Sequence, residues 1–151
     1  MEKAVHELIT TLDQQITFDE ITHIERIRPW LVLYDNPTGS VKLSIMDSSA
    51  TTTYAYKTQS VADMISAGDA TVATQYNHGL ISFIFDSVVH LQPGDYIVRL
   101  EASTGYTFAS SKFIGWVSDS DDPIGELGYT STGGLTTPLT MEIYSYNNVR
   151  N

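Results

Sequence analysis

Polar and apolar residues alternate with a period of two along most of the chain from Gln15 onward. The clearest run is 81–86, in which every second residue is large and apolar. Three further runs repeat this pattern: 41–46, 96–101 and 139–146. Because successive side chains of a β-strand point to opposite faces, each run predicts a strand with one buried face.

Turn signals separate these runs. Residues 35–39 read Asp-Asn-Pro-Thr-Gly and residues 92–95 read Gln-Pro-Gly-Asp, so each has a proline that presets φ and a glycine that accepts positive φ. We expect the turn at 35–39 to close a hairpin-like unit between the apolar run 27–34 and the strand at 41–46. Pro29 predicts an edge strand or a bulge, because proline cannot donate to a β-ladder.

About eight strands joined by polar turns predict an all-β fold, an antiparallel β-sandwich of jelly-roll type. We expect the sandwich domain to span residues 15–146 and residues 147–151 to form a polar tail. The residues expected in the core are the large apolar ones of the alternating runs, namely Leu43, Phe83, Phe85, Tyr96, Val98, Leu100 and Ile143.

Residues 1–14 depart from the period of two. Val5, Leu8, Ile9 and Leu12 fall at i, i+3, i+4 and i+7, the apolar stripe of a short helix. Such a segment is either a helix docked on the sandwich or an arm that orders on a partner, because an isolated helix of this length is marginal in water. We expect these four residues to make intersubunit contacts in a homo-oligomer such as a trimer, or in a lattice.

The composition of the chain argues against several classes of function. The 151 residues carry a net charge of −10 and no cysteine. Nucleic-acid binding is disfavoured because it rests on clustered lysine and arginine, and thiol catalysis and cysteine-based zinc sites are excluded. No window approaches the ~20 apolar residues of a membrane span, and the N-terminus does not read as a secretory signal, so we expect no membrane contact.

The stretch 118–126 concentrates acidic residues beside a tryptophan. Its calcium candidates are Asp119, Asp121, Asp122 and Glu126. The spacing fails the EF-hand pattern, because counting from Asp119 places Pro123 at position five and Ile124 at the position of the invariant glycine. A solvated acidic turn fits better, and we expect no bound metal or cofactor.

Catalytic motifs are absent from the sequence. The chain has no G-x-S-x-G sequence and no P-loop, and its four histidines show no H-x-x-x-H spacing. Eighteen acidic residues offer many carboxylate pairs, but nothing singles out one of them as a glycosidase pair. We therefore expect a non-enzymatic protein without catalytic residues.

Exposed aromatic faces would mark a glycan or partner site. Tyr106 and Tyr129 occur in glycine-flanked, loop-like stretches and are the first candidates, with a tyrosine lying over its own loop as the alternative. Trp30 and Trp116 lie in strand-like runs beside aliphatic residues, which favours the core for both, although Trp116 is kept as a possible contact.

The order of these pieces resembles a family of small jelly-roll β-sandwich modules found in bacteriophage virion proteins and beside carbohydrate-active enzymes. The resemblance covers roughly residues 16–146. It rests on segments 31–45, 81–85 and 91–100, on Trp116, and on the closing strand at 139–144. It implies a fold and a setting in a virus particle, but no catalytic residue.

Two functions follow from this resemblance. The first is a virion structural protein, a capsid cement or decoration protein that binds coat protein or another virion protein. The second is a glycan- or receptor-binding module of a phage fibre or a cell-surface protein.

Overall fold

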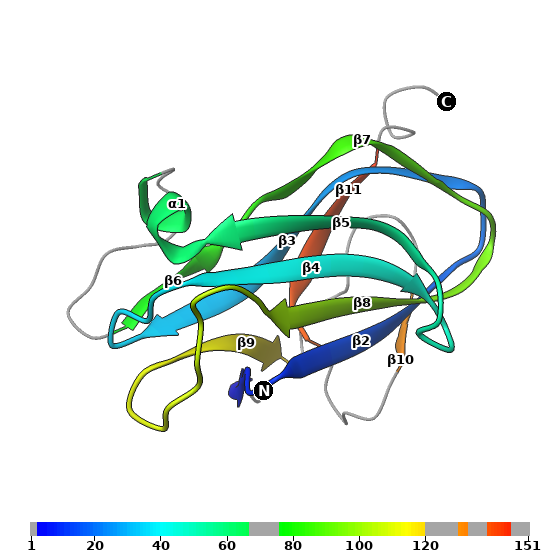
Figure 1. Ribbon diagram of the computed structural model, residues 1–151. Helices are drawn as coiled ribbons and strands as arrows, with labels where there is room; N and C mark the ends of the chain where they lie inside the picture. The colour runs from blue at the N-terminus through cyan, green and yellow to red at the C-terminus, as the bar shows by residue number, and fades with distance from the viewer. Residues whose placement is uncertain (1–2, 67–75, 120–129, 133–138, 146–151) are drawn as a thin grey trace.

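The computed structural model describes residues 3–66, 76–119, 130–132 and 139–145 (Figure 1). Within them the chain forms eleven β-strands and one short helix. The strands make two antiparallel sheets that pack face to face, so the predicted β-sandwich is confirmed. The jelly-roll connectivity stays a prediction.

The first sheet has six strands, which cluster around β3. Its members are β1 (Lys3–Glu7), β3 (Thr22–Tyr34), β6 (Tyr76–Leu80), β7 (Phe83–Leu91), β9 (Phe113–Asp119) and β11 (Met141–Ser145). The second sheet has five strands in the order β10-β2-β8-β4-β5. Its members are β2 (Thr11–Phe18), β4 (Ser40–Asp47), β5 (Thr53–Ser60), β8 (Gly94–Ala102) and β10 (Thr130–Thr132).

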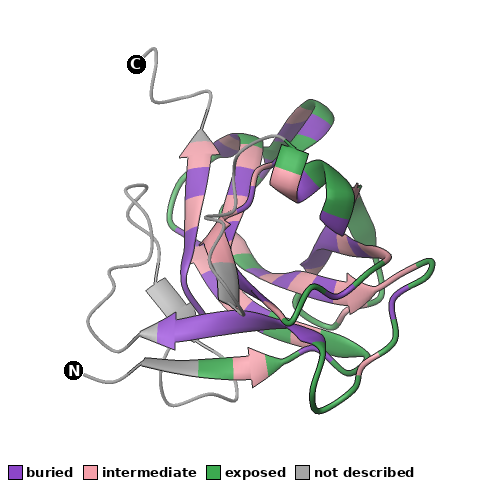
Figure 2. Ribbon diagram, turned by 90° about the vertical axis from the view of Figure 1, so that its left-hand side faces the viewer, coloured by how far each residue is buried: buried purple, intermediate pink, exposed green. Residues whose placement is uncertain are grey.

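The core lies between the two sheets. Figure 2 shows buried positions alternating with intermediate and exposed ones along the strands, as the period of two predicts. All seven residues expected in the core are buried, namely Leu43, Phe83, Phe85, Tyr96, Val98, Leu100 and Ile143. Among the described residues no helix has the length and apolar character that crossing a bilayer requires.

Strand β3 changes its partners at Pro29. Its first half pairs with β7 and β11, and its second half pairs with β6 and β9. Pro29 stands at this junction, where its carbonyl accepts a hydrogen bond from the Ile81 amide between β6 and β7. The prediction for Pro29 was therefore wrong in both of its alternatives, because β3 is a central strand and its register shifts lie near residue 25 and not at Pro29. A strand without an N–H at one residue can be central where its partner strands are interrupted.

Residues 1–14 do not form the predicted helix. Residues 3–7 form edge strand β1 beside β9, and β2 begins at Thr11 and lies between β10 and β8. The segment therefore belongs to the sandwich and is not a separate arm. Leu8 lies fully buried between the two strands, where its amide donates to the Ile114 carbonyl.

The described helix is α1 (Val61–Ser66), which follows β5 directly. Its Val61 and Met64 side chains are buried in the sandwich core. The Ser60 hydroxyl accepts a hydrogen bond from the Asp63 amide, which is the geometry of a helix N-cap.

The turn at 35–39 does not close a hairpin. Strands β3 and β4 belong to different sheets, so this turn carries the chain across the sandwich. Asp35, Asn36 and Gly39 have positive φ, which accounts for the residue types found there. The expected hairpin-like unit was wrong because turn chemistry fixes the reversal of the chain and leaves open which sheet receives the next strand.

Gly39 crosses closely over Gly105 of the β8–β9 connection. A Cβ atom at Gly39 would overlap the backbone of Gly105 and Tyr106, and the φ of Gly39 is +94°. The neighbouring Ser40 exchanges backbone hydrogen bonds with Ser103 and Thr104. The β3–β4 and β8–β9 connections can therefore approach this closely only because residue 39 has no Cβ atom.

We predict that Gly39→Ala destabilises the protein more than Gly94→Ala. Both glycines have positive φ, which costs an alanine about 1–3 kcal/mol, but a Cβ at Gly94 meets no atom within 4 Å. Urea unfolding followed by circular dichroism measures both variants. Equal losses of stability would contradict the close crossing of the two connections.

The Tyr106 hydroxyl makes two buried hydrogen bonds. It donates to the Leu8 carbonyl at 2.7 Å and accepts from the Ile114 amide at 3.0 Å. Burial raises the pKa of this hydroxyl. The β8–β9 connection is thus fastened to the β1–β2 connection and to β9.

We predict that Tyr106→Phe lowers the free energy of unfolding by about 1–3 kcal/mol, because it leaves a buried carbonyl and a buried amide without this partner. Chemical denaturation monitors the change. The matched control is Tyr56→Phe, at a tyrosine that is 59% exposed. A Tyr106→Phe variant as stable as this control would show that the two hydrogen bonds add nothing.

Candidate functional site

Strands β5 and β7 are edge strands of the two sheets in the described chain and lie on the same side of the sandwich (Figure 1). An open groove runs between them. It has a volume of about 720 Å³ and is lined by Thr53–Thr58 of β5 and by Phe85–His90 of β7. This volume falls in the range of ~300–1,000 Å³ that is typical of ligand sites. Among the described residues the two strands share no β-ladder, so the facing edges leave a groove.

The shape of the groove follows from a bulge in β7. On one side of the bulge Ile84 pairs with Arg26, and on the other side Val89 pairs with Ile24. Residues 85–88 of β7 therefore stand opposite the single residue Glu25 of β3. A bulge bends the strand that contains it, and here it leaves the extra residues as one wall of the groove.

Polar contacts join the two walls toward the middle of β5. The Lys57 ammonium lies 3.0 Å from the Asp86 carboxylate, and the Gln59 amide donates to the Ser82 carbonyl. Lys57, Asp86 and Phe85 also line a second hollow of about 550 Å³ beside the first. The ion pair is exposed and so adds little stability, but its charges face both hollows.

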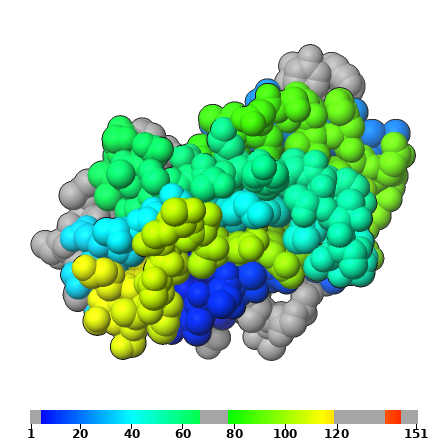
Figure 3. All heavy atoms as spheres, in the orientation of Figure 1, coloured from blue at the N-terminus to red at the C-terminus, as the bar shows by residue number. Residues whose placement is uncertain are grey.

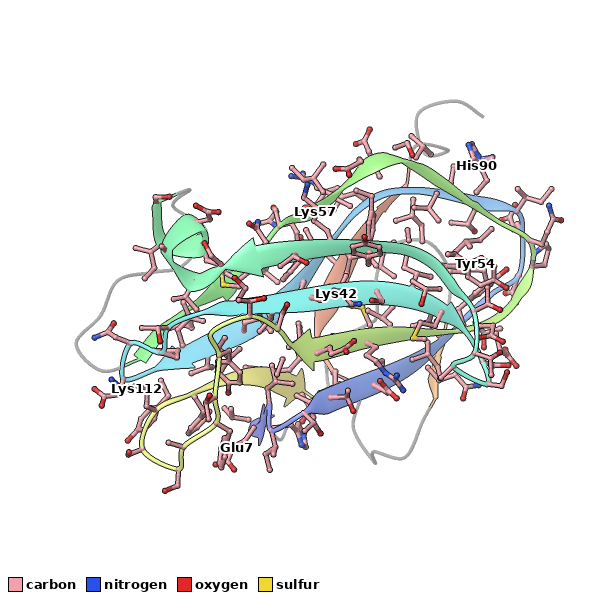
Figure 4. The ribbon with its side chains drawn as sticks, viewed as in Figure 1. Glu7, Lys42, Tyr54, Lys57, His90 and Lys112 are labelled. Carbon is pink, nitrogen blue, oxygen red and sulfur yellow. The ribbon has the colours of Figure 1, made fainter. Side chains whose placement is uncertain are left out.

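Two tyrosines of β5 present their rings on this side of the protein. Tyr54 is 48% exposed and lines the groove, where its ring meets the buried Tyr96 edge-on at 5.6 Å. Tyr56 is 59% exposed, and the Lys42 ammonium lies 5.0 Å from its ring centre. Figure 4 shows Tyr54 and His90 toward the same end of the groove, with Lys57 farther along β5.

Tyr54 lies apart from the regular alternation of β5. Ile45 pairs with Ala55 and Met46 pairs with Thr53, so Tyr54 is the extra residue of a bulge. The Tyr54 ring contacts Tyr96 and borders the groove, while the Tyr56 ring also borders the groove and lies beside Lys42. The local irregularities in β5 and β7 thus occur beside the same groove.

The turn before β5 is held by Asp47. Its carboxylate accepts hydrogen bonds from the Thr51 and Thr52 amides and from the Ser49 and Thr51 hydroxyls. These bonds favour the charged form and hold the pKa of Asp47 well below its ordinary value of 3.8, with the Thr52 amide as the largest cause. This turn sets where β5 begins and so positions Tyr54.

The sequence-based aromatic candidates lie elsewhere. Trp116 is fully buried, and its indole N–H donates to the Thr140 carbonyl, which confirms the core interpretation. Tyr106 is buried as described above, so its prediction as an exposed contact was wrong. Trp30 is half-buried in β3 and packs near the His78 ring. Tyr129 lies outside the described residues.

Most of the acidic stretch also lies outside the described residues, including Asp121, Asp122 and Glu126. Ser118 and Asp119 belong to β9, so the strand extends further than expected, and Ser118 is fully buried. The side chain of Asp119 is not described. Within the described part of the chain, no three histidine, aspartate or glutamate residues form a metal-binding group.

Of the four residues expected to mediate assembly, two pack in or against the core and two are exposed. Leu8 is part of the sandwich core and Leu12 packs against it. Val5 is 44% exposed and Ile9 is 58% exposed, at the opposite edge of the sandwich from the groove. Leu8 was wrongly assigned to an intersubunit surface. From the sequence alone, apolar residues at helical spacing look the same as apolar strand residues that face the protein's own core.

Tyr54 and Tyr56 were not identified from the sequence as surface aromatics. The available signal was the polar setting of both tyrosines, in a run of threonines and a lysine with few aliphatic residues. Such a run predicts an exposed edge strand, on which a ring has no core to enter.

Comparison with known proteins adds no relative. The chain matches no family model. No curated protein matches it either. The groove is therefore interpreted from its own residues.

We predict that Asp47→Ala lowers the melting temperature at neutral pH and that the loss depends on pH. A carboxyl whose pKa is depressed in the folded state stabilises that state above its ordinary value of 3.8, and this contribution fades as the pH falls below that value. Melting curves from pH 7 to pH 2.5 would show the difference from wild type shrinking. Glu25→Ala, at an exposed position of β3, is the control. A loss that stays constant across this range would contradict the role of the charged carboxylate.

Proposed function

We propose that the chain is a non-enzymatic structural protein of a virus particle, a cement or decoration protein that attaches to a coat protein or another virion protein. In this proposal the sandwich is a jelly roll, and the β5–β7 side is its contact surface. The setting in a particle rests on the resemblance described above. The contact surface rests on the observation that β5 and β7, each an edge strand within the described residues, lie on one side of the protein.

Exposed apolar side chains gather along these two edges. Tyr54 and Tyr56 project from β5, and Ile84, which is 53% exposed, projects from β7. Edge strands carry unpaired backbone groups that readily bind another chain, and exposed apolar residues beside them favour such binding. Figure 3 shows β5 and β7 running side by side on the face turned to the viewer.

Charge does not prevent such an attachment. The chain carries a net charge of −10, which repels further copies at long range. Screening at physiological salt limits this repulsion to a Debye length of ~8 Å. At the contact surface the Lys57 charge is paired with Asp86, and Lys42 beside Tyr56 lies 4.0 Å from the Glu101 carboxylate. Contacts at short range therefore decide attachment.

A glycan-binding module is the second candidate, and the groove favours it. Tyr54 offers a half-exposed ring inside an open groove, and Lys57, Asp86 and His90 supply polar groups along the same walls. A sugar site combines an apolar platform with a few polar groups that fix its orientation.

The test begins with virus particles produced from a genome that encodes this chain. We expect the protein to band with intact particles in a density gradient, and the recombinant protein to rebind particles that lack it. The Tyr54→Ala, Tyr56→Ala double variant is expected to rebind at least tenfold more weakly, because truncating aromatic anchors in an interface costs about 2 kcal/mol or more. Ile9→Ser, at the opposite edge, is the matched control and should rebind normally.

Absence of the protein from purified particles would contradict the structural role. Binding of a soluble oligosaccharide that Tyr54→Ala abolishes would favour the second candidate in its place. Rebinding that Ile9→Ser weakens and the tyrosine variant does not would move the contact surface to the β1–β2 edge.

A further inference from the structure

Two histidines face each other across the β3–β7 ladder. His23 and His90 are directly paired in the antiparallel register, and their Nδ1 atoms are hydrogen-bonded to each other. Their rings stand edge to face with centres 4.5 Å apart. His23 is half-buried, whereas His90 is exposed and forms part of the groove wall.

This arrangement joins two nitrogen atoms that can each bind a metal. In a neutral imidazole one ring nitrogen carries a proton and the other has a lone pair. The hydrogen bond therefore requires one Nδ1 to donate and the other to accept. Imidazole nitrogen is a preferred ligand of zinc, copper and nickel ions.

We propose that His23 and His90 bind one divalent transition-metal ion through their two Nδ1 atoms. Zinc binds imidazole nitrogen at about 2.0–2.1 Å, so two nitrogens that already face each other need only small side-chain rotations to hold an ion between them. The proton of the donor ring moves from Nδ1 to Nε2 through solvent. Both rings then remain neutral, and no net proton is released.

The rest of the coordination shell is open. Among the described residues no further histidine, aspartate or glutamate joins the pair to make a group of three. Water therefore fills the remaining positions, on the side where His90 borders the groove. A metal held in this way resembles a catalytic metal more than a structural one, in that positions stay free for an added ligand.

The ion would also fasten a weak part of the sheet. Beyond the β7 bulge the ladder consists of the three pairs Thr22–Leu91, His23–His90 and Ile24–Val89, with the histidines in the middle. In the described chain β7 is an edge strand that pairs with β3 alone. A metal bridge across the central pair would hold this end of β7 in register and thereby stabilise the groove wall.

The experiment uses the full chain without an affinity tag, titrated with Zn²⁺ and with Ni²⁺ in isothermal calorimetry. We expect one ion per chain and a melting temperature that rises with metal concentration, because the ion binds only the native pairing. In NMR spectra the added Zn²⁺ should shift the imidazole signals of His23 and His90 together. Amide exchange of Thr22–Ile24 and Val89–Leu91 should slow at the same time.

Variants assign the ligands. His23→Asn and His90→Asn are each expected to lose the bound ion and the rise in melting temperature, while their circular dichroism stays that of the wild type. His78→Asn, a half-buried histidine of β6, is the matched control and should keep both. Absence of binding to the wild type, or binding that His23→Asn and His90→Asn leave intact, would overturn the proposal. Metal-induced shifts at His6 or His78 alone would overturn it as well.

Discussion

The sandwich depends on strand β3, which is thirteen residues long and exchanges its neighbours at one proline. Each half of β3 has a partner strand on both of its edges, so four other strands are held in place through it. Proline has no backbone N–H to donate to a neighbouring strand. Pro29 can still lie in a central strand because the partner strands of β3 change at this residue. The six-stranded sheet is therefore organised by one strand with two sets of neighbours.

Much of the fold could be predicted from the sequence, because one buried face imposes a period of two on a strand. That rule located the cores of β4, β7, β8 and β11. It failed for residues 1–14, where two strands joined at a bend happen to place apolar residues at helical spacing. It also could not assign strands to sheets, since the turn at 35–39 carries the same residues whether it closes a hairpin or crosses the sandwich.

The candidate site was less predictable for a related reason. The groove exists because β5 and β7 are the last strands on one side of their sheets, and the position of a strand in a sheet is a property of long-range pairing. The bulges that aim Tyr54 and shape the β7 wall depend likewise on register with β4 and β3. Tyr106 shows the converse, because this tyrosine of a loop-like stretch is buried and donates a hydrogen bond to the Leu8 carbonyl.

Pairing between the two ends of the chain has a consequence for how the protein is made. Strand β11 lies beside the first half of β3, and the Arg28 side chain reaches Tyr144 across 116 positions of sequence. The Gln14 side chain likewise accepts a hydrogen bond from the Leu139 amide, 125 positions away. Contacts so distant in sequence slow folding, since a long loop must close before they form. During synthesis on the ribosome, β3 can pair with β7 and β9 before it pairs with β11, so one edge of its first half stays open until residues 141–145 have emerged.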